Sequence, residues 1–321
     1  MNNKTARELL KKKNVVSVGR GTKKVGGSET NRGAIVIGVR KKVPVEHLKP
    51  QDLIPMAVDG DETDVIEVGD IKLLSDPTAK HRPAPAGVSI GHFEITAGTL
   101  GAWVRKHGEW FILSNNHILA NINEAARFDT ILQPGPADGG QLGQDTIANL
   151  HDFVPIAMID ISNCSIARGT AWIFNLIAAL FRRQTRLVPM ATEVTNKVDC
   201  ALARPTGGDV ILPEVLDIGV ITGEAEFILG ETVIKSGRTT GVTQGTVGQL
   251  EVMANVQMGD GKVAIFEDQV MITTSNFSAP GDSGSAILNQ DKKIVGLLFA
   301  GGSGISLANR YSHVKKALGL D

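Results

Sequence analysis

Ser283, in the stretch "SAPGDSGSAILN" (278–289), is a residue that could carry chemistry. Gly, Asp and Ser are ordinary turn residues, so a loop between two strands is one interpretation of this stretch. The other is a nucleophilic serine whose neighbouring backbone N–H groups point at a developing oxyanion. A serine hydroxyl is a weak nucleophile until an adjacent base accepts its proton and a third group orients that base.

The chain offers one candidate for each partner. Of the seven histidines, only His117 ends an apolar, strand-like run, "EWFILSNNHILA", which would hold its imidazole on a rigid corner. Asp199 lies in "TNKVDCALARP" between apolar neighbours, where an unpaired carboxylate would cost several kcal/mol and an imidazole N–H would satisfy it. Taken alone, a structural histidine and a turn-capping aspartate are the alternative interpretations.

The three residues together indicate a function more specifically than any one of them does alone. They occur in the order His117, Asp199, Ser283, which is the order of chymotrypsin-type triads. The order Ser–Asp–His of α/β-hydrolases is excluded for this set. The Gly-x-Ser-x-Gly elbow of those enzymes is also missing, because position 285 is a serine.

Three segments resemble the catalytic segments of trypsin-like serine proteases. "LSNNHILA" resembles their histidine segment, "VDCALARP" their aspartate segment and "GDSGSAIL" their serine segment. "IVGLLFAGG" resembles the strand that follows the serine and pairs with bound peptide. "SGRTTGVTQGTV" resembles a hairpin found in bacterial members of this superfamily and in the plant Nal1-type proteins.

The resemblance implies a role for each matching residue. Ser283 would be the nucleophile, His117 the general base and then acid, and Asp199 the residue that orients the imidazole. The backbone N–H groups of Gly281 and Ser283 would form the oxyanion hole. The residues expected to bind substrate are Phe277, Phe299, Ala300 and Gly301. Because Phe277, six positions before the serine, would form the floor of the P1 pocket, we expect a small or medium apolar P1 side chain.

Asp282 carries a further expectation. In trypsin-type zymogens, the residue before the nucleophile pairs with a newly cut N-terminal amine. Here the linker could be cut so that an amine near Val88 reaches Asp282, or the chain could stay whole and Asp282 could pair within the barrel. "PAGVSIG" lacks a basic residue before a β-branched pair, so we favour the uncut chain.

The elements that must position these residues change in character along the chain. Residues 1–75 are expected to form a small α/β domain with a pro- or regulatory role, and residues 76–87, which carry three prolines, a linker. Residues 88–321 contain many short strands with Gly-rich turns. The fold predicted for this domain is mainly β, and the resemblance makes it a double six-stranded β-barrel. An apolar helix near 171–183 is inserted, and we expect it to pack on the barrel rather than to contact a membrane or partner. Arg182, Arg183 and Arg186 flank it, so an interfacial role stays open.

Composition excludes several classes of protein. With 33 basic and 34 acidic residues, the net charge of −1 argues against a nucleic-acid binder. The start of the chain lacks the apolar stretch of a secretory signal. Only two cysteines occur, Cys164 and Cys200, which favours a reducing cytoplasm. The apolar segment 171–181 is too short to span a bilayer. The Cys and His residues show no metal-ligand spacing, and no cofactor is expected.

The sequence therefore predicts a cytoplasmic serine endopeptidase that acts on a protein or peptide substrate. Two alternatives remain open: a protease-fold module that binds peptides without cleaving them, and an esterase that uses the same triad. We expect no nucleic-acid partner, and contact with a membrane would be unexpected. Any regulatory protein partner stays unidentified.

Overall fold

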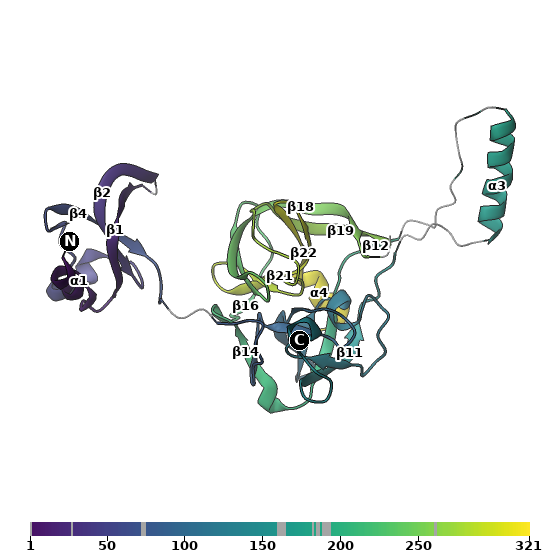
Figure 1. Cartoon of the computed structure of the whole chain (residues 1–321), viewed down its shortest axis with the longest axis horizontal. Coiled ribbons are helices and arrows are strands. Elements are labelled where there is room, and N and C mark those ends of the chain that lie inside the picture. Colours follow the sequence, from purple (N-terminus) through teal and green to yellow (C-terminus); the bar gives the residue numbers. More distant parts are fainter. Residues whose placement is uncertain are drawn as a thin grey trace. The chain divides into compact units, whose positions relative to one another are not determined.

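The computed structural model describes residues 2–26, 28–71, 75–158, 165–181, 183, 187, 194–259 and 262–321. The chain divides into two compact units, Met1–Leu74 and Ser75–Asp321 (Figure 1). Strands account for more residues than helices in each unit. The prediction of a mainly β fold is therefore confirmed.

The first unit is a four-stranded sheet with one helix. Helix α1 (Asn3–Leu10) begins at a cap, because the Asn2 side chain accepts a hydrogen bond of 2.9 Å from the backbone N–H of Thr5. Leu9 packs with Val15 and Ile37 in the core of the unit. The strands are β1 (Val15–Val25), β2 (Ser28–Val39), β3 (Ala57–Val58) and β4 (Asp61–Glu67), in the order β1-β2-β4-β3. Strand β2 pairs antiparallel with β1 and parallel with β4, which makes this the expected small α/β unit.

The prediction that residues 76–87 form a linker is wrong. Ala84–Ala86 forms strand β5, which pairs with β14 (Ile211–Val215) and is buried. The indole N–H of Trp103 donates to the carbonyl of Ala84 at 2.7 Å. Strand β5 is the edge of the three-stranded sheet β15-β14-β5, with β15 at Gly219–Val220. Proline is tolerated on an edge strand, and Pro85 lies in this one. The segment therefore belongs to the second unit.

The first barrel of the second unit is a sheet that closes on itself. Its strands, in sheet order, are β7 (Gly98–Thr99), β6 (Ser89–His92), β10 (Thr130–Leu132), β11 (Thr146–Phe153), β13 (Ala201–Pro205), β9 (Glu109–Ser114) and β8 (Ala102–Lys106). The two ends of this order, β7 and β8, are separated by only Leu100 and Gly101. They form two halves of one bent strand, which makes a six-stranded barrel.

The second barrel closes through direct pairing. Its strands are β17 (Thr232–Gly237), β18 (Gly241–Gln257), β19 (Val263–Ile272), β22 (Ile305–Arg310), β21 (Lys293–Gly302) and β20 (Ala286–Leu288). Strand β22 pairs with both β19 and β21, and β20 pairs with both β17 and β21. Short strands β12 (Thr195–Asn196) and β16 (Gly223–Glu224) extend the sheet. The double six-stranded barrel is thus confirmed.

Helices are few in the second unit. Helix α2 (Asn116–Leu119) follows β9, and α4 (Tyr311–Leu318) follows β22. Helix α3 (Ser165–Leu180) is the insertion predicted near 171–183. Ile173, Leu176 and Leu180, which share one face of this helix at the spacing i, i+3, i+7, are 52%, 48% and 75% exposed. The expected packing is therefore not found, since the periodicity of a helix defines an apolar face but not what covers it.

No helix within the described ranges is long and apolar enough to cross a bilayer.

Candidate active site

The strand register of the first barrel brings His117 and Asp199 together. Strands β9 and β13 are antiparallel, with Ala201 opposite Ser114. The residues just after β9 therefore lie beside those just before β13. His117, in α2, is partly exposed, whereas Asp199 is completely buried.

The Asp199 carboxylate is held by three hydrogen bonds. One oxygen, Oδ2, lies 2.5 Å from Nδ1 of His117. The other, Oδ1, accepts the backbone N–H of Asn116 at 2.7 Å and that of His117 at 3.3 Å. These bonds offset the cost of burying the charge. They also place the imidazole proton on Nδ1, so Nε2 is left to accept a proton.

The side chains of two buried asparagines, Asn115 and Asn309, support this pair, and sequence reasoning did not find them. The Asn115 side-chain amide donates to the Asp199 carbonyl at 2.7 Å, and the backbone N–H of Asp199 donates to Oδ1 of Asn309 at 3.0 Å. Asn309 belongs to β22 of the second barrel, so the two barrels share this network. The signal available in the sequence was the pair of amides in "SNNH" directly after an apolar run.

Ser283 lies on the turn before β20, against the end of β9. A Cβ added to Gly284 would lie 2.2 Å from Oγ of Ser114, which shows how closely the two segments approach. The Ser283 carbonyl accepts the backbone N–H of Thr99 at 2.8 Å. Within the described part of the chain, the Ser283 hydroxyl donates to the Phe299 carbonyl at 3.4 Å and makes no hydrogen bond to His117.

The turn around Ser283 leaves two backbone donors available. Gly281 has φ of +99°, a conformation that favours glycine. A Cβ at this position would lie 2.4 Å from Oγ1 of Thr239. No acceptor among the described residues bonds to the backbone N–H of Gly281 or of Ser283. Two unused donors beside a serine hydroxyl fit an oxyanion site.

Asp282 is part of a buried ion pair. Its Oδ2 lies 3.2 Å from Nζ of Lys235, and both side chains are inaccessible to solvent. The backbone N–H groups of Thr239 and Thr240 donate to Oδ1 at 2.8 and 3.1 Å, and the Thr240 hydroxyl donates to Oδ2 at 2.7 Å. Burial lowers the pKa of Lys235, and the neighbouring carboxylate opposes this only in part. Asp282, the residue before Ser283, is therefore held by partners that belong to the second barrel.

Arg238 ties the same turn to the first barrel. Its Nε donates to Oδ2 of Asp138 at 2.8 Å, and its backbone N–H donates to Oγ1 of Thr99 at 3.0 Å. Thr99 in turn donates to the carbonyl of Gly281 at 2.9 Å. Burial would raise the pKa of Asp138, but hydrogen bonds from Arg238 and Ser89 outweigh it and leave that pKa below its usual range.

A cavity of about 390 Å³ opens beside Ser283. It is lined by uncharged residues, which are Ser278, Ala279, Pro280, Ser283, Leu298, Ala300, Gly301, Gly302 and Ser303. Phe277 is not among them. Its ring is buried in the core of the second barrel with Val247 and Ile272, which corrects the prediction that Phe277 forms the pocket floor. A large ring gains more by packing in that core than by lining an open cavity.

Buried His92 and partly exposed Asp129 form another His–Asp pair, which lacks the features of a base. Nε2 of His92 lies 3.1 Å from Asp129, and Nδ1 accepts the backbone N–H of Glu94 at 3.2 Å. His92 is fully buried and both of its ring nitrogens are occupied. It is therefore a structural histidine.

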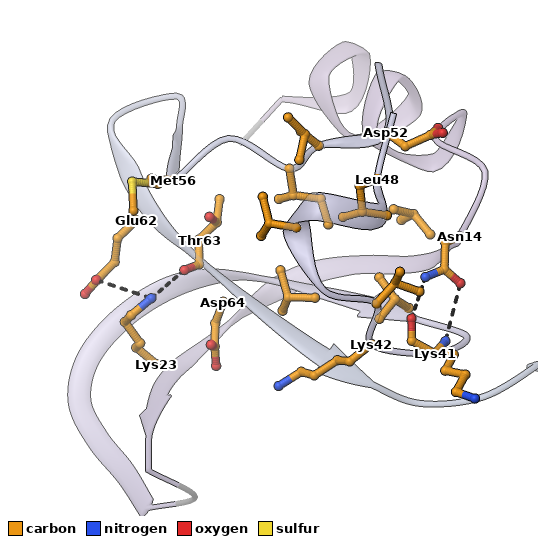
Figure 2. A pocket seen from close by; sticks show the side chains of 17 residues that line it. Asn14, Lys23, Lys41, Lys42, Leu48, Asp52, Met56, Glu62, Thr63 and Asp64 are labelled. Carbon is orange, nitrogen blue, oxygen red and sulfur yellow. Dashed lines mark hydrogen bonds and ion pairs between the residues drawn. The ribbon is translucent and has the colours of Figure 1, made fainter. Parts of the chain in front are cut away.

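The first unit holds a larger cavity, of about 640 Å³ (Figure 2). Apolar side chains line it together with polar ones such as Lys23, whose Nζ donates to the Thr63 carbonyl at 2.6 Å and lies 3.7 Å from Glu62. None of its lining residues is a serine, histidine or cysteine, so it offers no Ser–His or Cys–His pair. Among the described residues, no group of three His, Cys, Asp or Glu side chains could hold a metal ion.

A family model described as Peptidase S7, Flavivirus NS3 serine protease, matches residues 234–312, a segment that includes Ser283. No curated protein matches the chain. Similar solved structures include a glutamic-acid-specific serine protease at 17% identity and a TM-score of 0.46, covering 74% of this chain and 98% of that one. Protease A of Thermobifida fusca is 15% identical with a TM-score of 0.45, and the chymotrypsin of Cellulomonas bogoriensis is 16% identical with a TM-score of 0.44. Each match covers 74% of this chain and 96% of the other chain.

Proposed function

We propose that this chain is a serine endopeptidase with Ser283 as nucleophile, His117 as general base and Asp199 as the residue that orients the base. The observation that carries the proposal is the pair of His117 Nδ1 and the buried Asp199 carboxylate, 2.5 Å apart, beside the turn that holds Ser283. The family model that matches the serine segment supports it.

In the proposed reaction, the Ser283 hydroxyl turns from the Phe299 carbonyl toward Nε2 of His117. Oγ attacks the carbonyl carbon of the scissile bond while its proton passes to Nε2. The resulting oxyanion is bound by the backbone N–H groups of Gly281 and Ser283. His117 then gives the proton to the leaving amine nitrogen, and the peptide bond breaks to leave an ester on Ser283. Water, deprotonated by His117, hydrolyses that ester and restores the serine.

Peptide would bind along strand β21 beside the cavity. Between Ala300 and Gly302, this strand pairs with β22 on one side. Its pairing with β20 on the other side reaches only Leu297. The backbone of Phe299, Ala300 and Gly301 can therefore accept an extended peptide as an additional strand. The uncharged cavity next to Ser283 suits a small or medium uncharged P1 side chain, since an unpaired buried charge would be costly.

The remaining assignments are also proposals. The first unit would act as a folding or regulatory domain that stays attached to the active enzyme. A reducing compartment such as the cytoplasm fits Cys200, a free thiol that is completely buried and whose pKa is raised by that burial. The relation to bacterial proteases of the kind that resembles plant Nal1-type proteins stays a prediction.

A fluorophosphonate probe tests the proposed function, because it reacts only with an activated serine. We expect the probe to label the wild type and not the Ser283→Ala variant, and the wild type to degrade unfolded casein. Labelling without casein cleavage, but with hydrolysis of small esters, would favour the esterase. Absence of labelling in a folded wild-type protein would favour the peptide-binding module.

A further inference from the structure

The inserted helix α3 exposes an unusually large apolar surface. Its large apolar side chains, together with that of Phe181 just after it, are each more than two-fifths exposed; they are Ile166, Trp172, Ile173, Phe174, Leu176, Ile177, Leu180 and Phe181. Scattered single exposures of this kind are normal on a protein surface, but a contiguous set marks an interaction site.

These side chains share one side of the helix. At 100° per residue, Ile166, Ile173 and Ile177 lie within about 40° of one another, and the rest flank them. The opposite side carries Arg168, Asn175 and small alanines. Asn175 is engaged by the chain that follows: its side chain donates to the Leu187 carbonyl at 2.9 Å and accepts the Leu187 N–H at 2.7 Å. The polar side is thus partnered and the apolar side is open.

The charge of the insertion indicates what the open side meets. Between Ile161 and Thr192 the sequence has four arginines, at 168, 182, 183 and 186, and no aspartate or glutamate. Asp160 and Glu193 bound this stretch, and the chain outside residues 161–192 has 29 basic and 34 acidic residues. The concentrated positive charge of the stretch is complementary to an anionic surface. It also disfavours pairing with a second copy, since two such helices would bring eight arginines together without an acid.

We propose that α3 binds an anionic lipid surface. The helix lies in the plane of the interface with its apolar side among the upper acyl chains, and the net positive charge of the insertion attracts the anionic headgroups. Its 16 residues are too few to span a bilayer, which needs about 20. Trp172, at the border of the apolar side, fits the headgroup level that tryptophan prefers. This inference replaces the prediction that the helix packs on the barrel, and it does not depend on the proposed protease activity.

Flotation of the full chain with lipid vesicles tests the proposal. We expect the wild type to float with vesicles of phosphatidylcholine and phosphatidylglycerol, to float less with pure phosphatidylcholine, and to be released by high salt. A triple variant, Ile173→Gln, Ile177→Gln and Leu180→Gln, should partition roughly a hundredfold more weakly, because three apolar side chains leave the lipid. Replacing the four arginines by glutamine should remove the preference for anionic vesicles.

A matched control changes the other side of the same helix. Ala167→Gln with Ala179→Gln adds the same polar residue at positions that are not fully buried, and it should leave flotation unchanged. Thermal unfolding of each variant shows that the fold is retained. Failure of the wild-type protein to float with either type of vesicle would overturn the proposal. So would a wild-type dimer that the triple variant converts to a monomer without any vesicle binding, because α3 would then cover a second copy.

Discussion

Nζ of Lys235 lies 3.2 Å from Oδ2 of Asp282, and neither side chain is exposed to solvent. The cation therefore comes from strand β17 of the same barrel, and no new N-terminal amine is needed to neutralise Asp282. This confirms the expectation that Asp282 finds its partner inside the barrel. Val88, the position near which a cut end was considered, is itself buried in the first barrel.

The first prediction concerns this ion pair. Lys235→Met should lower the free energy of unfolding by about 3–5 kcal/mol, because it leaves a buried carboxylate without its cation. It should also lower kcat roughly 10²-fold, since Asp282 adjoins both proposed oxyanion donors. Lys235→Arg keeps the charge and should retain the fold and most of the activity. Equal kcat in wild type and folded Lys235→Met would contradict a positioning role for Lys235.

The second prediction is the pH dependence of activity. Burial lowers the pKa of Lys235, so its ammonium group loses a proton at a lower pH than a free lysine. The ion pair is intact below that pKa and is lost as the pH rises through it. Activity should therefore decline on the alkaline side before the ordinary range of lysine is reached. A guanidinium group does not deprotonate there, so Lys235→Arg should move the decline to higher pH in a kcat–pH profile.

The third prediction addresses the proposed triad. Ser283→Ala and His117→Ala should each remove nearly all peptidase activity, whereas Asp199→Asn should leave a folded enzyme slowed by about 10⁴-fold. The measurement is kcat on a peptide ester and on casein, with circular dichroism as the control for folding. If Asp199→Asn cleaved at the wild-type rate, another carboxylate would have to orient His117; Asp152 is described in β11, and Asp160 lies outside the described residues.

The fourth prediction concerns Gly281→Ala. The added methyl group would require φ of +99° from an alanine and would lie 2.4 Å from Oγ1 of Thr239. The backbone N–H should therefore turn out of the proposed oxyanion site and lower kcat by roughly 10²–10³-fold, with a smaller effect on KM. Gly302→Ala, on the cavity wall, serves as a control because a Cβ there meets only Ile305 at 3.8 Å. A similar loss in both variants would argue against the assignment.

The fifth prediction is that the active protein is the uncut chain. Intact mass spectrometry of fluorophosphonate-labelled protein should give the mass of residues 1–321 plus the label, because Lys235 already neutralises Asp282. An active species that starts near Val88, with the full-length form unlabelled, would instead make the first unit an activation domain that is removed.

Sequence reasoning reached the His117–Asp199 pair because chain order and an apolar context constrain a buried carboxylate strongly. It failed for Phe277, since counting back from Ser283 fixes a place in the chain but not the direction of a side chain. It failed for residues 76–87 because proline occurs both in linkers and in edge strands. Lys235 and Asn309 were not found, because a buried polar residue is recognisable only through a partner that lies far away in the sequence.

The hydrogen bond between the Asp199 N–H and Asn309 joins the His117–Asp199 pair of one barrel to a strand of the other. Arg238 makes a second such connection, to Asp138. Local opening of either barrel would therefore disconnect the base or the nucleophile before the whole chain unfolds. The proposed activity should therefore be lost when the less stable of the two barrels opens. Amide hydrogen exchange at Thr99 and Asp199 would measure that local opening. A partly opened chain would thus be open to proteolysis while lacking the proposed activity.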